Sequence, residues 1–227
     1  MDHVWPHVHF LLRWVHLLAG ITWIGILYYF NLVQTPFFAK ADPAVRGGMV
    51  RGLVPEALWW FRHGAMVTFL TGLGMLAISA GVYKQHAALY PILGGAILGI
   101  TMWWNVWFRI WPNQQIVIQN AEETAAGRPA LPAAADAGKR AGLVSRTNFV
   151  FSIPMLLLMA AQQNMLPSHG KGWLIPLAVL AAVCVLQWNC LSGLDQPRQK
   201  FLGNLKSAMH RGIAIALVIY AVLVFAA

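Results

Sequence analysis

Six stretches of apolar residues, separated by shorter polar segments, dominate the pattern of this sequence. They cover residues 10–35, 58–82, 90–111, 149–165, 173–190 and 209–226. A helix needs roughly 17–25 apolar residues to cross the hydrocarbon core of a bilayer, and the Gly, Thr and Asn residues that interrupt these stretches are tolerated there. The pattern therefore predicts an all-α fold, a polytopic membrane bundle of about six transmembrane helices that forms one domain over residues 1–227.

The amino-acid composition agrees with a membrane protein. Hydrophobic residues make up 59% of the 227 residues and charged residues 10%, whereas a soluble domain has roughly 25% charged residues. Soluble enzymes, disordered chains and disulfide-rich scaffolds are thereby excluded. The chain has 11 Trp, 11 Phe and 5 Tyr, which fits the aromatic belts at the two surfaces of a membrane. Membrane lipid is the expected partner of the six spans.

Basic residues are distributed unevenly between the two sides of the predicted bundle. Lys and Arg number 16 against 7 Asp and Glu, and thirteen of the basic residues fall between spans one and two, three and four, and five and six or at the span ends that adjoin these loops. Because cytoplasmic loops collect Lys and Arg, we expect these three loops in the cytoplasm and both termini in the periplasm, in a bacterial inner membrane. A nucleic-acid partner is excluded, since the charges form no basic helix or basic-aromatic repeat.

The one long polar segment lies between the third and fourth spans. We predict a cytoplasmic loop over residues 112–146, with a flexible centre at residues 125–142 that is rich in Ala, Pro and Gly. Within it, residues 113–123 are suited to extend the third helix beyond the membrane.

Ionisable side chains inside membrane spans are rare, which makes each one a candidate for function. In the first span, His16 shares a helical stripe with Gly20 and Trp23. A glycine one turn from an imidazole leaves room for a flat macrocycle, and the imidazole nitrogen can ligate its iron. The alternative is a histidine that bonds a neighbouring helix or lies at the membrane interface.

His63 in the second span and His210 at the start of the sixth are the other candidate iron ligands. Proline favours the first turn of a helix, so the second helix can begin near Pro55 and place His63 a couple of turns inside. Arg62 beside it has the charge to pair with a haem propionate or an anionic substrate. For both histidines the alternative is an anchor at the membrane interface.

Asn105 and Arg109 in the third span lie four residues apart, so they are expected to share a helix face. With the tryptophans around them they form either a cationic pocket near the cytoplasmic surface or an aromatic belt with an Arg that reaches the interface. In the amino-terminal tail, His3, His7 and His9 have the spacing of a weak copper or zinc site.

Several runs of residues together form a recognisable pattern. The first is RWVHLLAGITWIG at residues 13–25, continued by YYFN at residues 28–31. The others are PEALWWFR at 55–62, WNVW at 104–107, SRTN at 145–148 and SIPM at 152–155. These runs cover roughly residues 10–160, and they resemble the membrane-bound bacterial urate oxidases of the urate hydroxylase type.

The resemblance implies a helical membrane domain followed by a periplasmic cytochrome c domain, with urate oxidised and electrons passed to the cytochrome. This chain ends at Ala227, just after the sixth span, so we expect it to lack the cytochrome domain. It has Thr147, Gln163 and Asn164 near positions where the family pattern has histidines, which leaves the substrate open. A first-span His followed by Trp-x-Gly is similar, more distantly, to the haem-binding protoporphyrinogen oxidase and copper-resistance membrane families.

The leading hypothesis is a urate-oxidase-like membrane redox protein that binds haem b and passes electrons to a c-type cytochrome or another respiratory subunit. His16 and His63 are the candidate axial ligands, with His210 as a substitute, and Arg62 or Arg109 is expected to pair with propionates or an anionic substrate. One haem between His16 and His63, one haem on either, and two haems all stay open, as does an oligomer.

The alternative hypothesis is a non-catalytic accessory or anchor subunit of a larger respiratory complex. Gly94, Gly95 and Gly99 give the third span a small-residue face of the kind that packs against another helix. A metal-permeation protein is a third class, which rests on the tail histidines and the copper-resistance likeness.

Overall fold

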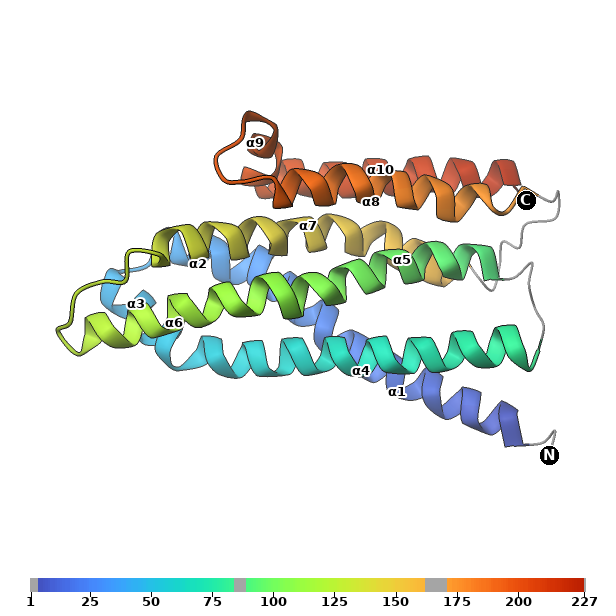
Figure 1. The fold of residues 1–227 in the computed structure, drawn as a ribbon, viewed down its shortest axis with the longest axis horizontal. Helices are drawn as coiled ribbons and strands as arrows, with labels where there is room; N and C mark the ends of the chain where they lie inside the picture. Colours follow the sequence, from blue (N-terminus) through green and yellow to red (C-terminus); the bar gives the residue numbers. More distant parts are fainter. Residues whose placement is uncertain (1–3, 84–88, 162–170, 227) are drawn as a thin grey trace.

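The described part of the chain folds into an elongated bundle of long helices (Figure 1). The computed structural model describes residues 4–83, 89–161 and 171–226. Its elements, in chain order, are α1 (Val4–Tyr28), η1 (Tyr29–Gln34), α2 (Thr35–Phe38), α3 (Pro43–Arg51), α4 (Leu53–Gly81), α5 (Leu89–Asn105), η2 (Val106–Ile110), α6 (Trp111–Ala125), α7 (Ala134–Ala161), α8 (Leu174–Leu191), η3 (Pro197–Gln199), α9 (Lys200–Gly203) and α10 (Leu205–Ala226). The segments η1 and η2 are π-helical, and no β-strand occurs in these described ranges.

Six helical segments of the described chain are long and apolar enough to cross a membrane, which confirms the predicted all-α fold with six spans. They are Val4–Phe38, Leu53–Gly81, Leu89–Ala125, Ala134–Ala161, Leu174–Leu191 and Leu205–Phe225. The second begins just before Pro55, because proline fits the first turn, where its missing N–H would have no helical partner.

The prediction of a loop over residues 112–146 is wrong for most of that segment. The third span continues through α6 to Ala125, which confirms the suggested extension, and α7 begins at Ala134, long before the predicted start of the fourth span. Alanine is the best helix former, which favours a helix in this Ala-rich segment. Ala137 is buried, and α7 packs against α6. The expected flexible centre therefore shrinks to the short connection between the two helices.

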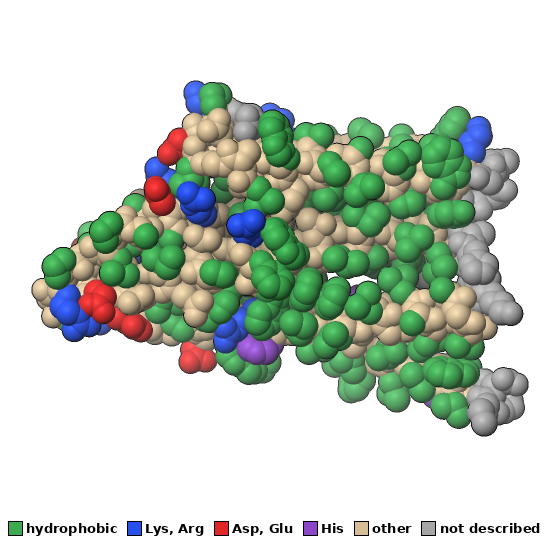
Figure 2. All heavy atoms as spheres, in the orientation of Figure 1, with side chains coloured by type: hydrophobic (Ala, Val, Ile, Leu, Met, Phe, Trp, Pro, Cys, Tyr) green, Lys and Arg blue, Asp and Glu red, His purple; other side chains and the backbone are tan. Residues whose placement is uncertain are grey.

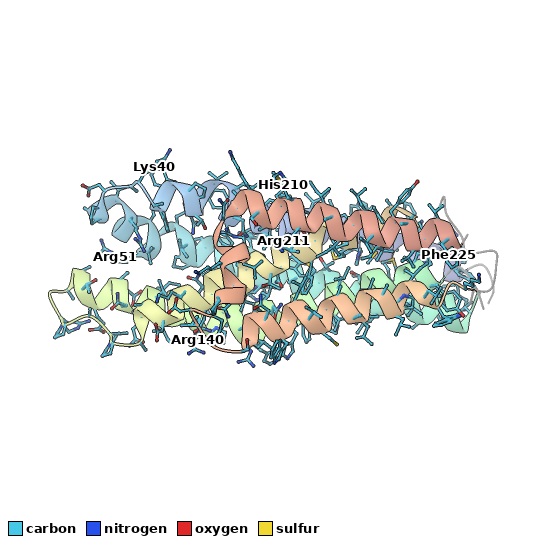
Figure 3. The ribbon with its side chains drawn as sticks, turned by 90° about the horizontal axis from the view of Figure 1, so that it is seen from above. Lys40, Arg51, Arg140, His210, Arg211 and Phe225 are labelled. Carbon is cyan, nitrogen blue, oxygen red and sulfur yellow. The ribbon has the colours of Figure 1, made fainter. Side chains whose placement is uncertain are left out.

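The central helix of the bundle is α7. In its apolar window 61% of the residues are buried, against 11% in that of the first span, because α7 packs against α5, α6 and α10 together. The helices α8 and α10 lie side by side (Figure 3), and α1 packs along α4. Polar groups on α7 are therefore enclosed by neighbouring helices instead of lipid.

Glycines allow close helix contacts at two places. A Cβ at Gly64 of α4 would lie 3.2 Å from the backbone nitrogen of Trp23 on α1. On α5, a Cβ at Gly95 would lie 2.8 Å from Met159 Cε of α7, and Gly94 packs against both α7 and α8. The small-residue face of the third span is thus used inside the bundle, so it does not by itself require a partner subunit.

The first described residue of α1 and the last of α10 lie at the same end of the bundle (Figure 1). Figure 3 shows Lys40, Arg51 and Arg140 towards the opposite end, away from Phe225, and Figure 2 shows the same bias in the Lys and Arg side chains on its face. We call this the basic end, marked by Lys40, Arg51 and Arg140. The uneven charge along the sequence thus corresponds to one end of the bundle, and its cytoplasmic location stays a prediction.

Candidate functional site

A cavity of about 490 Å³ lies between α1, α4, α5 and α7. In Figure 2 the surface is hollowed between α4 and α5. Pockets for small molecules and cofactors measure roughly 300–1,000 Å³, so the cavity has an ordinary size for a ligand site. Its lining is mostly apolar, and the polar lining residues include His9, Arg13, His16, Thr68 and Ser79. The cavity therefore suits a largely apolar ligand with a few polar groups.

His16 lies on the wall of this cavity, and α4 fixes which of its ring nitrogens has the hydrogen. Its Nδ1 is 3.1 Å from Oγ1 of Thr71. The Thr71 hydroxyl directs its single hydrogen at the carbonyl oxygens of Val67 and Thr68, at 2.6 and 3.1 Å, so it accepts from His16. Nδ1 is then the protonated nitrogen, and Nε2 has the lone pair that can ligate a metal.

Glycines leave space around the imidazole of His16. A Cβ at Gly72 would lie 3.2 Å from His16 Cε1, so any larger residue there would press on the ring. Gly20 and Gly25 also line the cavity, and a Cβ at either would meet open space. Trp23 lines the cavity as a buried residue. The structure thus places His16, Gly20 and Trp23 on one wall, as the helical stripe predicts.

Two basic groups line the cavity on the amino-terminal side of His16. Arg13 precedes His16 by one helical turn and His9 by two, both on α1. The His9 ring meets Tyr83 edge-on, with centroids 5.9 Å apart. Arg13 presents a guanidinium fork suited to a carboxylate of a bound ligand. Arg13 was not among the predicted site residues, although its position three residues before His16 places both on one helix face.

His63 and Arg62 lie on α4 closer to the basic end, and neither lines the cavity. His63 Nδ1 donates to the backbone carbonyl of Trp59 at 2.8 Å, and the two rings are in contact with centroids 4.2 Å apart and planes tilted by 31°. The Arg62 guanidinium carbon lies 3.9 Å from the ring centroid of Trp111. These cation–π and ring contacts are typical of an aromatic anchor at a membrane interface.

His210 is exposed on the first turns of α10, where Figure 3 labels it. The cavity lining, within the described residues, includes none from α10. The three candidate histidines therefore lie apart from one another, and of the three His16 alone lines the cavity.

Asn105 and Arg109, which were predicted to share a helix face, differ in burial. The π-helical segment η2 begins directly after Asn105, and its i→i+5 bonding winds the chain more loosely than an α-helix. Asn105 is fully buried, and its amide donates to Asn148 Oδ1 at 2.7 Å and Gln187 Oε1 at 3.1 Å. Arg109 is exposed, with its guanidinium carbon 5.0 Å from the centroid of Trp104. Asn105 therefore ties helices together, and Arg109 belongs to the aromatic belt.

The other π-helical segment, η1, places Asn31 against α7. Asn31 Nδ2 donates to Ser145 Oγ at 3.1 Å, and Asn31 Oδ1 accepts from Arg146 Nε at 3.0 Å. Arg146 Nη1 also donates to the carbonyl oxygen of Leu202 at 3.2 Å. Both π-helical regions thus meet the SRTN run at residues 145–148, which forms a polar junction between helices outside the cavity lining.

Within the described residues, no group of three or more His, Cys, Asp or Glu side chains is placed to bind a metal ion. Of the tail histidines, His3 lies outside the described residues and His9 lines the cavity. An iron inside a macrocycle differs from a free ion, since it needs one or two protein ligands.

One family model, described as Urate oxidase N-terminal, matches residues 78–222 of this chain. The matched range starts near the end of α4 and continues into α10, so it includes Asn105, Arg109 and His210, while His16 and His63 precede it. A search of curated proteins and a search of solved structures each found no match.

Proposed function

Because the chain belongs to the urate oxidase N-terminal family, we propose that it is a urate-oxidase-like membrane redox protein that binds haem b beside His16. One observation carries the haem: an imidazole whose Nδ1 pairs with the Thr71 hydroxyl lies on the wall of a largely apolar cavity. The family match supports the class of protein, and the donor set and shape of the cavity support the cofactor.

The residues around the cavity fit the separate parts of a haem. His16 offers Nε2 to the iron, and Thr71 accepts the hydrogen bond that metal-ligating histidines generally donate from their other ring nitrogen. The open space beside Gly20 and Gly25 suits a flat ring. Arg13 has the charge and shape to pair with a propionate. The sequence suggested Arg62 or Arg109 as the partner of a propionate, but neither of these lines the cavity, so we assign this role to Arg13.

Bound haem would supply one-electron redox chemistry between a reduced substrate and an electron acceptor. The chain's own side chains bind and orient the group. His16 would hold the iron, Thr71 would orient the His16 ring, and Arg13 would neutralise a propionate. The apolar walls exclude water, which lowers the local dielectric around a bound haem and thereby influences its reduction potential.

The proposal uses only His16 of the three candidate histidines. His63 packs against Trp59 and His210 is exposed on α10, and neither lines the cavity. A haem that bridges His16 and His63 would need the part of α4 around His63 to move towards the cavity. One haem ligated by His16 needs no such movement, so we favour it.

We propose that the electrons pass to a c-type cytochrome or another respiratory subunit, and that the bundle resides in a bacterial inner membrane. The six apolar spans and the gathering of Lys and Arg at the basic end support an orientation with that end in the cytoplasm. The termini would then lie in the periplasm, on the side where the resemblance expects the cytochrome.

Urate is the first substrate to test, because of the family. Thr147 stands where the family pattern has a histidine; it is fully buried and donates to the carbonyl oxygen of Leu143 at 3.0 Å. Gln163 and Asn164, the other departures, lie outside the described residues. Because the chain departs from the family pattern at these positions, the substrate test compares urate with a related planar anion that can be oxidised.

The deciding experiment is an absorption spectrum of the purified full chain after haem supplementation. We expect wild type to show a Soret band that His16→Ala loses, while the matched variants His63→Ala and His210→Ala keep it. A wild-type chain without a Soret band, or His16→Ala with the wild-type spectrum, contradicts the proposal. Urate-dependent reduction of added cytochrome c by the loaded protein then tests the substrate and the acceptor.

A further inference from the structure

We propose that Met155 is the second axial ligand, opposite His16, so that the chain binds its haem through one imidazole and one thioether. This inference rests on the proposed function, because it concerns how the same cavity would ligate the iron. It rests on the side chains that line the two facing walls of the cavity, on the depth of His16 and Met155 along the bundle, and on the contact between the Met155 sulfur and Gly99.

The two walls of the cavity differ in their donor atoms. The α1 and α4 wall has the nitrogen donors, with His9, Arg13 and His16 on α1. On the α5 and α7 wall, every described lining residue is an aliphatic residue or glycine except Met155 and Met159. A haem that lies between the walls with His16 on one side can therefore meet a side-chain lone pair on the other side only at a methionine sulfur.

His9 is unsuited to the second position, although it is a histidine in the same cavity. It lies two turns from His16 on the same helix, and both line the same wall. A ligand trans to His16 has to approach the iron from the opposite face. Met75 is on α4, which also belongs to the His16 wall.

The stack of Phe69 on Trp103 sets the relative level of α4 and α5. Their ring centroids are 4.1 Å apart and the planes differ by 8°. The two helices belong to consecutive spans and run in opposite directions. One turn from each ring, towards the end of the bundle where the two chain termini lie, are Gly72 on α4 and Gly99 on α5. Gly72 and Gly99 therefore lie at about the same depth in the bundle.

These two glycines are next to the two proposed ligands. A Cβ at Gly72 would lie 3.2 Å from His16 Cε1, and a Cβ at Gly99 would lie 3.7 Å from Met155 Sδ. Met155 thus lies at the depth of His16 on the opposite wall. Met159, one turn further along α7, packs over Gly95 with its Cε 2.8 Å from where a Cβ would be, so it serves as a matched control.

Ligation by His and Met has a measurable consequence. A thioether in the second axial position raises the reduction potential of a haem. Replacing Met155 by Leu conserves volume, and volume-conserving swaps are the best tolerated in a packed core, so the fold should survive while the sulfur is lost. Replacing it by His supplies a nitrogen donor in place of the sulfur.

The experiment compares wild type, Met155→Leu, Met155→His and Met159→Leu as haem-loaded full chains, by ferric and ferrous absorption spectra and by redox titration. We expect Met155→Leu to keep the Soret band, lose the weak long-wavelength band of thioether-ligated ferric haem and fall in midpoint potential. Met155→His should give the spectrum of a haem with two nitrogen ligands. Met159→Leu should match wild type.

The outcomes separate this inference from the proposed function. If Met155→Leu has the wild-type spectrum and potential while His16→Ala loses the Soret band, the Met155 assignment is overturned and the haem proposal stands. The same holds if Met159→Leu shows the change in place of Met155→Leu. If wild type binds no haem, both proposals fail.

Discussion

The Nδ1 atom of His16 and the Oγ1 atom of Thr71 lie 3.1 Å apart and join the first and second spans across 55 residues of sequence. The Thr71 hydroxyl directs its hydrogen at the carbonyl of Val67 in its own helix, so it accepts from the imidazole. One buried threonine thereby decides the tautomer of the histidine that we propose as a haem ligand.

Thr71→Val removes this acceptor and keeps the shape of the side chain. With Nδ1 unpaired, the ring is free to rotate and to change tautomer, so we expect haem affinity to fall by about 10- to 100-fold, the usual effect of losing such an outer partner. Haem titration followed at the Soret band measures it. Thr101→Val is the control, since within the described residues Thr101 Oγ1 bonds only the carbonyl oxygen of Ile97 in its own helix. Equal loss in both variants would contradict the role of Thr71.

Gly72→Ala adds a methyl group 3.2 Å from His16 Cε1. The ring then has to shift by a few tenths of an ångström, and crowding of this kind costs about 1–3 kcal/mol, or roughly 5- to 150-fold in haem affinity. Gly81→Ala on the same helix is the matched control, because a Cβ there meets nothing within 4 Å. Unchanged haem affinity in Gly72→Ala would show that the ring position does not control binding.

Gly212→Ala tests the contact between α10 and α7. A Cβ there would lie 2.5 Å from Ile153 Cδ1 and 3.2 Å from the carbonyl oxygen of Val150, an oxygen that Pro154 cannot bond because proline has no N–H. We expect a loss of about 1–3 kcal/mol in the free energy of unfolding, measured by thermal unfolding in detergent. Gly142→Ala, where a Cβ meets open space, should retain wild-type stability.

Asn105→Ala breaks the amide cluster that joins α5, α7 and α8. It leaves Asn148 Oδ1 and the Gln187 side chain without their partner at Asn105, and unpaired buried polar groups cost about 1–3 kcal/mol. A double-mutant cycle with Gln187→Leu should give a coupling of roughly 0.6–1.7 kcal/mol, the range of interhelical bonds in membranes. Asn113→Ala should change stability little, because in the part of the chain that the structure describes its amide donates only to the carbonyl oxygen of Arg109. A coupling near zero between Asn105 and Gln187 would contradict a stabilising role of the amide cluster.

Hydropathy was sufficient to predict six apolar helical spans, but it did not show where the helix that contains the fourth span begins. The helix that contains this span begins at Ala134, within a segment that is polar enough to be expected as a loop. Alanine there supports a helix through its propensity, and the contact with α6 buries Ala137 and Ala141. Hydropathy reports transfer into lipid, so it misses a helix that continues outside the lipid.

Periodicity predicted the wall around His16 correctly, but it did not show that Asn105 is buried while Arg109 is exposed. From His16 to Trp23 the chain is α-helical, so a spacing of three or four gives a common face. Between Asn105 and Arg109 the segment η2 is π-helical. The hydrogen bonds of Asn105 to α7 and α8 accompany this local change, and no pattern within the span itself contains those partners.

The sequence by itself determined that six helices are long and apolar enough to cross a membrane, that basic residues gather at one end, and that the runs around His16, Asn105 and Arg146 resemble one family. Only the tertiary structure decided that His16 meets Thr71, and that His63 and Arg62 stand apart from the cavity. It also brought Met155 to the wall facing His16. The physical reason is that segment hydrophobicity governs insertion into lipid, whereas the meeting of helix faces depends on close packing and hydrogen bonds between distant segments, since lipid gives no hydrophobic preference among them.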